Sequence, residues 1–222
     1  EVDVTSDDKV KTAFDKAQRL TVPVYLNGRG PYQFVVDTGA NRSVVSQEVV
    51  AAIGLPTAGF AAVHGIVSAE PAPMVKVDRL RVGEVLSSGL RLPSAPASRL
   101  GAEGILGLDA MRGRRVRLGF LEGTFSIDAA SIGPQLARGH DTRIPQAGAP
   151  VTVPARYRSG QLVILDAEAA GRQITAFLDS GSQVTVGNHA LRDLVFSAQP
   201  QLTMQVILSQ LISATGQQAP AE

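Results

Sequence analysis

Two Asp-Thr/Ser-Gly triplets are the residues of this 222-residue chain whose types and spacing could do chemistry. They are Asp37-Thr38-Gly39 and Asp179-Ser180-Gly181, and each follows an apolar run. Two carboxylates within hydrogen-bond reach of one water cannot both ionise cheaply, so they share a proton. The charged partner can then act as a general base on the water, while the protonated partner polarises a carbonyl. A pairing of Asp37 with Asp179 therefore predicts hydrolysis by an activated water.

The triplets occupy matching places in an internal repeat. In the first half, Asn27-Gly28-Arg29 precedes an apolar strand pattern, the triplet and then Ser43-Val44-Val45. In the second half, Ala170-Gly171-Arg172 precedes the same order of features, and Thr185-Val186-Gly187 is the counterpart of the strand after the triplet. The repeat is much longer than the periods of about 20–50 residues found in solenoids, so it predicts duplicated lobes. The competing interpretation is that both triplets are tight turns, where Asp and Gly are favoured anyway.

The elements around the triplets predict a mainly β protein with two lobes. Short runs rich in Val, Leu and Ile alternate with turns, and the chain has 22 Gly and 13 Pro. A short helix is expected over residues 47–53, ended by Gly54. We expect an N-terminal extension over residues 1–19 that is helical from 6 to 19, a first lobe over 20–128, a linker over 129–149 and a second lobe over 150–222. Whether the extension is a pro-segment stays open.

These features resemble the retroviral-type (retropepsin-like) aspartic proteases, in the bacterial single-chain form related to the pepsin clan. The resemblance covers residues 20–128 well and 150–222 in part, and it implies closed-barrel lobes in which a strand delivers each catalytic Asp. The segment Ile105, Leu106 and Gly107 matches the family's apolar-apolar-Gly run, which threads beside the Asp as a ψ-shaped loop. The family's substrate-binding flap falls on His64, Gly65, Ile66 and Val67.

The resemblance also implies roles for the residues next to the two carboxylates. Thr38 and Ser180 would brace the two loops across the lobe interface. Gly39 and Gly181 would let the backbone pass close to the carboxylates and offer them N–H groups. The resemblance therefore assigns to these four residues the support of an Asp37/Asp179 dyad.

The residues after the triplets differ, because Ala40 follows the first and Ser182 follows the second. A Ser182 hydroxyl that donates to the dyad would lower its pKa and favour a mildly acidic to near-neutral optimum. The alternative is that both are merely small residues in a tight loop.

The second lobe departs from the family pattern. Residues 206–219 are consistent with a second flap hairpin, but no further apolar-apolar-Gly segment or closing hairpin follows in the sequence. Three explanations stay open. The chain is truncated or clipped and a complementing C-terminal fragment exists; another chain completes the lobe in a dimer; or the chain is a degenerate relative that binds without cleaving.

Composition argues against several other classes of function. A net charge of +1 gives no field that attracts nucleic acid. There are no cysteines, and His64, His140 and His189 lack metal-ligand spacing, so the sequence predicts no metal and no cofactor. No apolar run approaches the roughly 20 residues that span a bilayer. Together with the resemblance to bacterial proteases, an N-terminus without Met and the absence of cysteine favour a periplasmic or cell-envelope location.

The sequence therefore predicts an aspartic endopeptidase that hydrolyses a peptide or protein substrate in the cleft between its lobes. The first alternative is a non-catalytic peptide-binding module that uses the same cleft. The second is a structural β-domain, in which Asp37 and Asp179 would lie far apart. The sequence does not identify the substrate.

Overall fold

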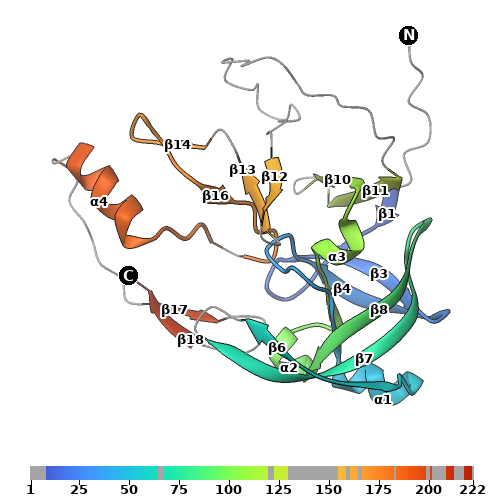
Figure 1. Cartoon of the computed structure of the whole chain (residues 1–222). Coiled ribbons are helices and arrows are strands. Elements are labelled where there is room, and N and C mark those ends of the chain that lie inside the picture. Colours follow the sequence, from blue (N-terminus) through green and yellow to red (C-terminus); the bar gives the residue numbers. More distant parts are fainter. Residues whose placement is uncertain are drawn as a thin grey trace, which may run out of the picture.

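The computed structural model describes residues 9–64, 68–119, 123–129, 155–158, 161–164, 167–182, 184–198, 201, 209–212 and 218–221. The described chain is mainly β, as expected (Figure 1). Strands coloured from blue to green form the first lobe, and the elements from yellow to red follow the stretch expected as a linker. That linker, apart from Ala129, lies outside the described residues, as do Gly65, Ile66 and Val67 of the expected flap.

Six strands close into a barrel in the first lobe, where the predicted fold class is confirmed. Two further strands extend the sheet, β2 (Ala13–Phe14) beyond β3 and β6 (Thr57–His64) beyond β7. The 14-residue β7 joins stretches that the sequence pattern predicts as separate strands. Around the barrel the order is β3 (Leu20–Leu26), β4 (Arg29–Val36), β9 (Gly104–Leu106), β5 (Val44–Ser46), β8 (Val85–Ala95) and β7 (Ala69–Val82), which pairs back with β3.

Apolar side chains from alternate strand positions fill the barrel. Val22, Val24 and Leu26 of β3 are fully buried, because successive residues of a strand point to opposite faces. The turn between β3 and β4 contains Asn27 and Gly28 with φ of 49° and 81°. A two-residue hairpin turn of this kind requires positive φ at both positions, so the Asn-Gly signal correctly located the hairpin that leads to Asp37.

Three short helices lie on the first lobe. The first, α1 (Gln47–Ile53), begins after Ser46, whose Oγ accepts a hydrogen bond from the Val49 N–H at 3.1 Å, and ends at Gly54 in the left-handed conformation. These bounds match the sequence prediction. The second is α2 (Ala97–Leu100), and the third is α3 (Leu108–Met111).

The helix expected over residues 6–19 is wrong for the described part of that range. Residues 9–14 form β1 (Lys9–Lys11) and β2, and β1 pairs with β11 (Thr124–Ala129), whose other neighbour is β10 (Arg114–Gly119). Val10 is buried in the core, where it packs against Gly83. Long-range strand pairing has therefore outweighed a local helical preference, which is a weak determinant of structure.

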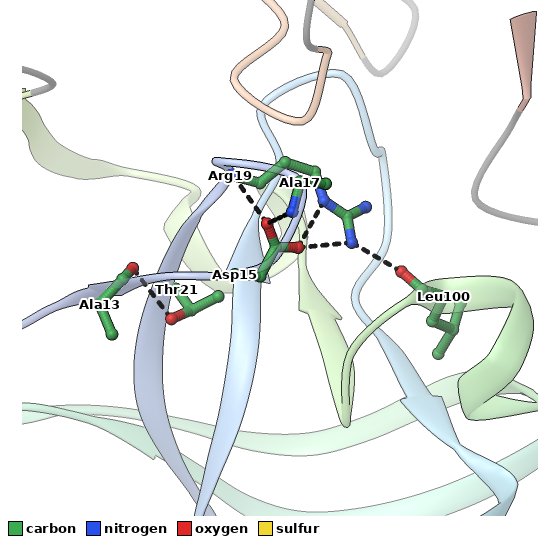
Figure 2. A network of polar contacts seen from close by, with 6 residues as sticks. All are labelled: Ala13, Asp15, Ala17, Arg19, Thr21 and Leu100. Atoms are coloured by element: carbon green, nitrogen blue, oxygen red, sulfur yellow. Dashed lines mark hydrogen bonds and ion pairs between the residues drawn. The ribbon is translucent and has the colours of Figure 1, made fainter.

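An ion pair closes the turn between β2 and β3 (Figure 2). The Asp15 carboxylate accepts hydrogen bonds from the backbone N–H groups of Ala17 at 2.9 Å and Arg19 at 2.8 Å. It also binds the Arg19 guanidinium, with Nη2 at 2.7 Å from Oδ2. Arg19 Nη2 donates further to the Leu100 carbonyl at 3.0 Å, at the end of α2. The N-terminal segment is thereby attached to the loop that leads into β9.

The second half of the chain contains smaller sheets. Residues Ala170 and Gly171, both with positive φ, form the turn between β14 (Glu168–Ala169) and β15 (Arg172–Gln173). An antiparallel hairpin of β17 (Ser209–Ile212) and β18 (Gln218–Ala221) falls on the stretch expected to form one. The remaining elements are a sheet of β12 (Ala155–Arg158), β13 (Gln161–Ile164) and β16 (Ala176–Phe177), and the helix α4 (His189–Ala198).

The repeat breaks down just after the second triplet. Residues 184–188 are irregular, so the expectation that Thr185-Val186-Gly187 repeats the strand Val44–Ser46 is wrong. In the first lobe that strand is held by β9 and β8. No described strand pairs with residues 184–188, and Val184 and Val186 are exposed. A strand needs a partner for its backbone hydrogen bonds.

Among the described helices, none combines the length and apolarity needed to cross a membrane.

Candidate active site

Asp37 stands at the end of a strand that is held on both sides. Strand β4 pairs with β3 and, in parallel, with β9, so that Val36 lies opposite Leu106. The Asp37 N–H then donates to the Leu106 carbonyl at 3.0 Å. The structure thus places Ile105 and Leu106 of β9 directly beside the strand that leads into Asp37, and Gly107 follows them.

Thr38 and Ser180 join the two triplets by exchanging hydrogen bonds. The Thr38 N–H donates to Ser180 Oγ at 3.1 Å, and the Ser180 N–H donates to Thr38 Oγ1 at 3.0 Å. Each hydroxyl also donates to the strand of the other half, Thr38 Oγ1 to the Leu178 carbonyl at 2.7 Å and Ser180 Oγ to the Val36 carbonyl at 2.8 Å. Both residues are buried, so the four bonds fix the two loops to each other. The interpretation of the triplets as unrelated turns is therefore wrong.

Each carboxylate is held in the same way by the backbone that follows it. One oxygen of each Asp accepts from the N–H groups two and three residues further along the chain. This double acceptance orients the carboxylate and favours its charged form. The bonds are Gly39 and Ala40 to Asp37 Oδ1, at 2.8 and 2.9 Å, and Gly181 and Ser182 to Asp179 Oδ1, at 2.9 and 3.1 Å.

Glycine is required in both triplets because each passes against the opposite carboxylate. A Cβ atom added at Gly39 would lie 2.6 Å from Asp179 Cγ, and one added at Gly181 would lie 2.6 Å from Asp37 Cγ. These contacts are far inside van der Waals distance, so any side chain would push the carboxylates apart. The structure thus brings together all six residues of the two triplets.

The electrostatic setting of Asp37 favours its protonated form. The pKa of Asp37 is raised from 3.8 to about 6, first by burial and then by the neighbouring charge and hydrogen bond of Asp179. The N–H groups of Ala40 and Gly39 act in the opposite direction on this pKa, because they stabilise the carboxylate. Because these effects raise its pKa, Asp37 is suited to hold a proton at mildly acidic pH.

Other predicted site residues fall outside this centre. Ser182 Oγ donates to the Val184 carbonyl at 2.7 Å, so in this structure its hydroxyl is not directed at a carboxylate. His64 is exposed at the end of β6, opposite Ala69 of β7. The β6–β7 hairpin is therefore present, but its role as a flap stays a prediction. Within the described part of the chain, no group of three or more potential ligands could hold a metal ion.

Sequence analysis missed two residues that support the Asp37 loop, Ser43 and Asp109. Asp109 Oδ1 accepts hydrogen bonds from Ser43 N at 2.8 Å and Ser43 Oγ at 2.7 Å. Ser43 Oγ in turn accepts from the Gly107 N–H at 3.0 Å. Asp109 ends the string Gly-Ile-Leu-Gly-Leu-Asp over residues 104–109, which was a signal of its place beside the site.

Comparisons with known proteins found a family match and a similar solved structure. Residues 22–113 match the model of a family described as gag-polyprotein putative aspartyl protease, a stretch that includes the first triplet and ends before the second. A solved structure of a retropepsin-like aspartic protease from Rickettsia conorii is similar at 14% identity and a TM-score of 0.40, over 54% of this chain and 89% of that chain. No curated protein matches the sequence. The family match and the barrel around Asp37 support a retropepsin-like aspartic protease, as the resemblance predicted.

Proposed function

We propose that the chain is an aspartic endopeptidase that hydrolyses peptide bonds with a water held between Asp37 and Asp179. The observation that carries the proposal is the reciprocal exchange of hydrogen bonds between Thr38 and Ser180. A turn with a purely structural role would not need buried hydroxyls that bind it to a second triplet far away in the sequence. A pair of carboxylates that must share one water does need that constraint, because catalysis depends on fixed geometry.

The two carboxylates have different roles in this proposal. Asp37 carries the shared proton, because its pKa is raised to about 6, chiefly by burial. Its protonated oxygen polarises the carbonyl of the bond to be cleaved. Asp179 acts as the general base that takes a proton from the attacking water. The backbone N–H groups after each triplet keep both carboxylates oriented during this exchange.

This assignment gives activity a defined dependence on pH. Because Asp37 must be protonated, kcat/KM is expected to fall as pH rises through about 6. A series of initial rates with one cleavable peptide between pH 4 and 8 measures the descending limb. A rate that stays constant up to pH 8 would contradict the role of Asp37 as the proton carrier.

The substrate class expected for this site is an extended peptide. The β6–β7 hairpin, with His64 at the end of β6 and Gly65, Ile66 and Val67 next in the sequence, is proposed as the flap over that peptide. The test is incubation of a mixed peptide library with the chain and with Asp37→Asn, followed by mass spectrometry of the products. Cleavage by the wild-type chain alone supports the proposal. Peptide binding without turnover at any pH between about 3 and 8 would instead favour the peptide-binding module.

A further inference from the structure

Asp109 is a partly buried carboxylate that the proposed chemistry does not use. It lies in the first turn of α3, immediately after the segment that threads beside Asp37. A single oxygen, Oδ1, accepts from Ser43 N, Ser43 Oγ and Ala110 N, at 2.8, 2.7 and 2.9 Å. Ser43 is fully buried. Asp109 therefore ties α3 to the chain that follows the first triplet, 66 residues away in sequence.

The same stretch of chain is attached to the ψ-loop at further points. The Leu108 N–H donates to the Ala40 carbonyl at 2.9 Å, and the Gly107 N–H donates to Ser43 Oγ at 3.0 Å. The backbones are in contact here, since a Cβ atom added at Gly107 would lie 2.5 Å from the carbonyl carbon of Arg42. Residues 40–43 are thus held against residues 107–109 at both ends.

Ala40 connects this attachment to the reacting carboxylate. Its carbonyl is held by Leu108, while its N–H donates to Asp37 Oδ1 at 2.9 Å. The position of that N–H therefore depends on how firmly residues 40–43 are fixed. We propose that Asp109 is a positioning residue, which holds residues 40–43 so that the N–H groups of Gly39 and Ala40 stay directed at Asp37. The inference rests on the proposed function, because it assigns to Asp109 the alignment of that proposed dyad.

The bonding pattern of Asp109 provides a matched pair of variants. All three bonds end on one oxygen, so Asp109→Asn can keep an acceptor in the same place, while it removes the charge and replaces Oδ2 by an NH2 group. Asp109→Ala removes the acceptor itself. Ser43→Ala is an intermediate case, because it removes the hydroxyl that donates to Asp109 and accepts from Gly107, while the backbone N–H of residue 43 can still bind Asp109. The three variants separate the loss of the acceptor from the loss of the charge.

The kinetic expectation follows from misalignment of the dyad without a change in substrate contacts. In Asp109→Ala, kcat is expected to fall about 100-fold, as for small displacements of catalytic groups, with KM nearly unchanged. Asp109→Asn should stay close to the wild type, and Ser43→Ala should fall between the two. Equal kcat in Asp109→Ala and Asp109→Asn would overturn the inference. If Asp109→Ala does not fold, the kcat values of Ser43→Ala and Asp109→Asn decide the question. A lower kcat in Ser43→Ala supports the inference, and equal kcat values in the two variants would overturn it.

A second readout does not depend on turnover. The pKa of the Asp37 carboxyl can be followed by carbon-13 NMR of Asp-labelled protein, with the signal assigned by Asp37→Asn. The N–H groups of Ala40 and Gly39 lower this pKa, and Asp179 is the charged group that acts on it. Loss of their alignment in Asp109→Ala should therefore raise the pKa of Asp37, whereas Asp109→Asn should leave it unchanged.

The two readouts distinguish failure of the inference from failure of the proposed function. If the chain cleaves no peptide but the pKa of Asp37 rises in Asp109→Ala alone, the proposed function fails and the positioning role stands. If the wild type cleaves peptide and neither kcat nor the pKa of Asp37 differs between the two Asp109 variants, the positioning role fails and the proposed function stands.

Discussion

The two half-sites carry nearly the same triplet in very different surroundings. Strand β4, which leads into Asp37, is paired on both sides and all of its last three residues are buried. Strand β16, which precedes Asp179, pairs with β13 alone among the described strands. Phe177 and Leu178 before Asp179 are 51% and 41% exposed. The triplet therefore sets the hydrogen bonds of each carboxylate, while the surrounding lobe sets how strongly that carboxylate is desolvated.

The loops that follow the triplets differ in the same direction. Residues 40–43 are fixed by Leu108 and Asp109, whereas the Ser182 hydroxyl after the second triplet is bonded within its own loop, to Val184. The acid role proposed for Asp37 follows from this asymmetry, since burial is the largest cause of its raised pKa. Substitutions in one half-site at a time test this difference between the two half-sites.

The largest effect on stability is expected from the charge of Asp37. Its raised pKa means that the folded chain binds this proton more tightly than the unfolded chain. The resulting stabilisation is fully present below pH 3.8 and is lost as pH rises through about 6. A rise from 3.8 to about 6 corresponds to at most about 3 kcal/mol. The unfolding free energy of Asp37→Asn, relative to that of the wild type, should therefore rise by up to that amount between pH 4 and pH 8, as measured by urea unfolding.

Asp179→Asn is the matched variant for this experiment. It removes the neighbouring charge that contributes to the shift but leaves the burial of Asp37, which is the larger cause. The pKa of Asp37 should therefore fall only partly towards 3.8 in Asp179→Asn, as followed by NMR. A complete return to 3.8 would mean that repulsion, and not the depth of the first lobe, distinguishes the half-sites.

The next effect concerns the bonds that join the half-sites. Thr38→Val and Ser180→Ala each remove a hydroxyl that donates one hydrogen bond and accepts another. Each variant should lose about 2 kcal/mol of unfolding free energy, at about 1 kcal/mol for each bond. The double variant should lose less than the sum, because each hydroxyl partners the other residue. Strict additivity in urea unfolding would show that the two halves are not coupled through this contact.

A smaller effect is expected from the anchor of the first lobe. Arg19→Lys keeps the positive charge but cannot bind Asp15 and the Leu100 carbonyl with the same planar group. We expect a loss of about 1 kcal/mol of unfolding free energy, since the pair is only partly buried. Hydrogen exchange should show faster opening at Leu100 and in β9, with no change in α4. Equal acceleration in α4 would contradict the assignment of this anchor to the first lobe alone.

Local signals in the sequence were sufficient for much of the first half-site. The Asn27-Gly28 turn defines the hairpin that ends at Asp37, because few residues other than Asn and Gly adopt positive φ readily. Ser46 and Gly54 mark the two ends of α1. The resemblance of Ile105-Leu106-Gly107 to the family's apolar-apolar-Gly run located β9, whose residues are all buried between β4 and β5. In each case the signal is a short stretch of sequence with a distinctive composition or a residue at the end of the element itself.

Features that depend on distant partners could not be predicted in the same way. The apolar spacing of Val10 and Phe14 fits a helix, but β11 and β3 supply strand partners that the local pattern does not reveal. The bond between Ser43 and Asp109 joins residues of ordinary type across 66 positions. Conversely, the composition of residues 185–187 suits a strand, yet the described structure gives them no partner. Pairing across the fold decides all three cases.

Replacement of Asp179 by Asn tests the central claim most directly. Asp179 lies in the more exposed half-site and beyond the stretch that matches the family model. If Asp37 and Asp179 act as one dyad, Asp179→Asn lowers kcat for peptide cleavage by roughly 1,000-fold or more, as expected for loss of the general base. The urea midpoint at pH 5 should change little, which shows that the fold is retained. Near-full activity in Asp179→Asn would contradict the account.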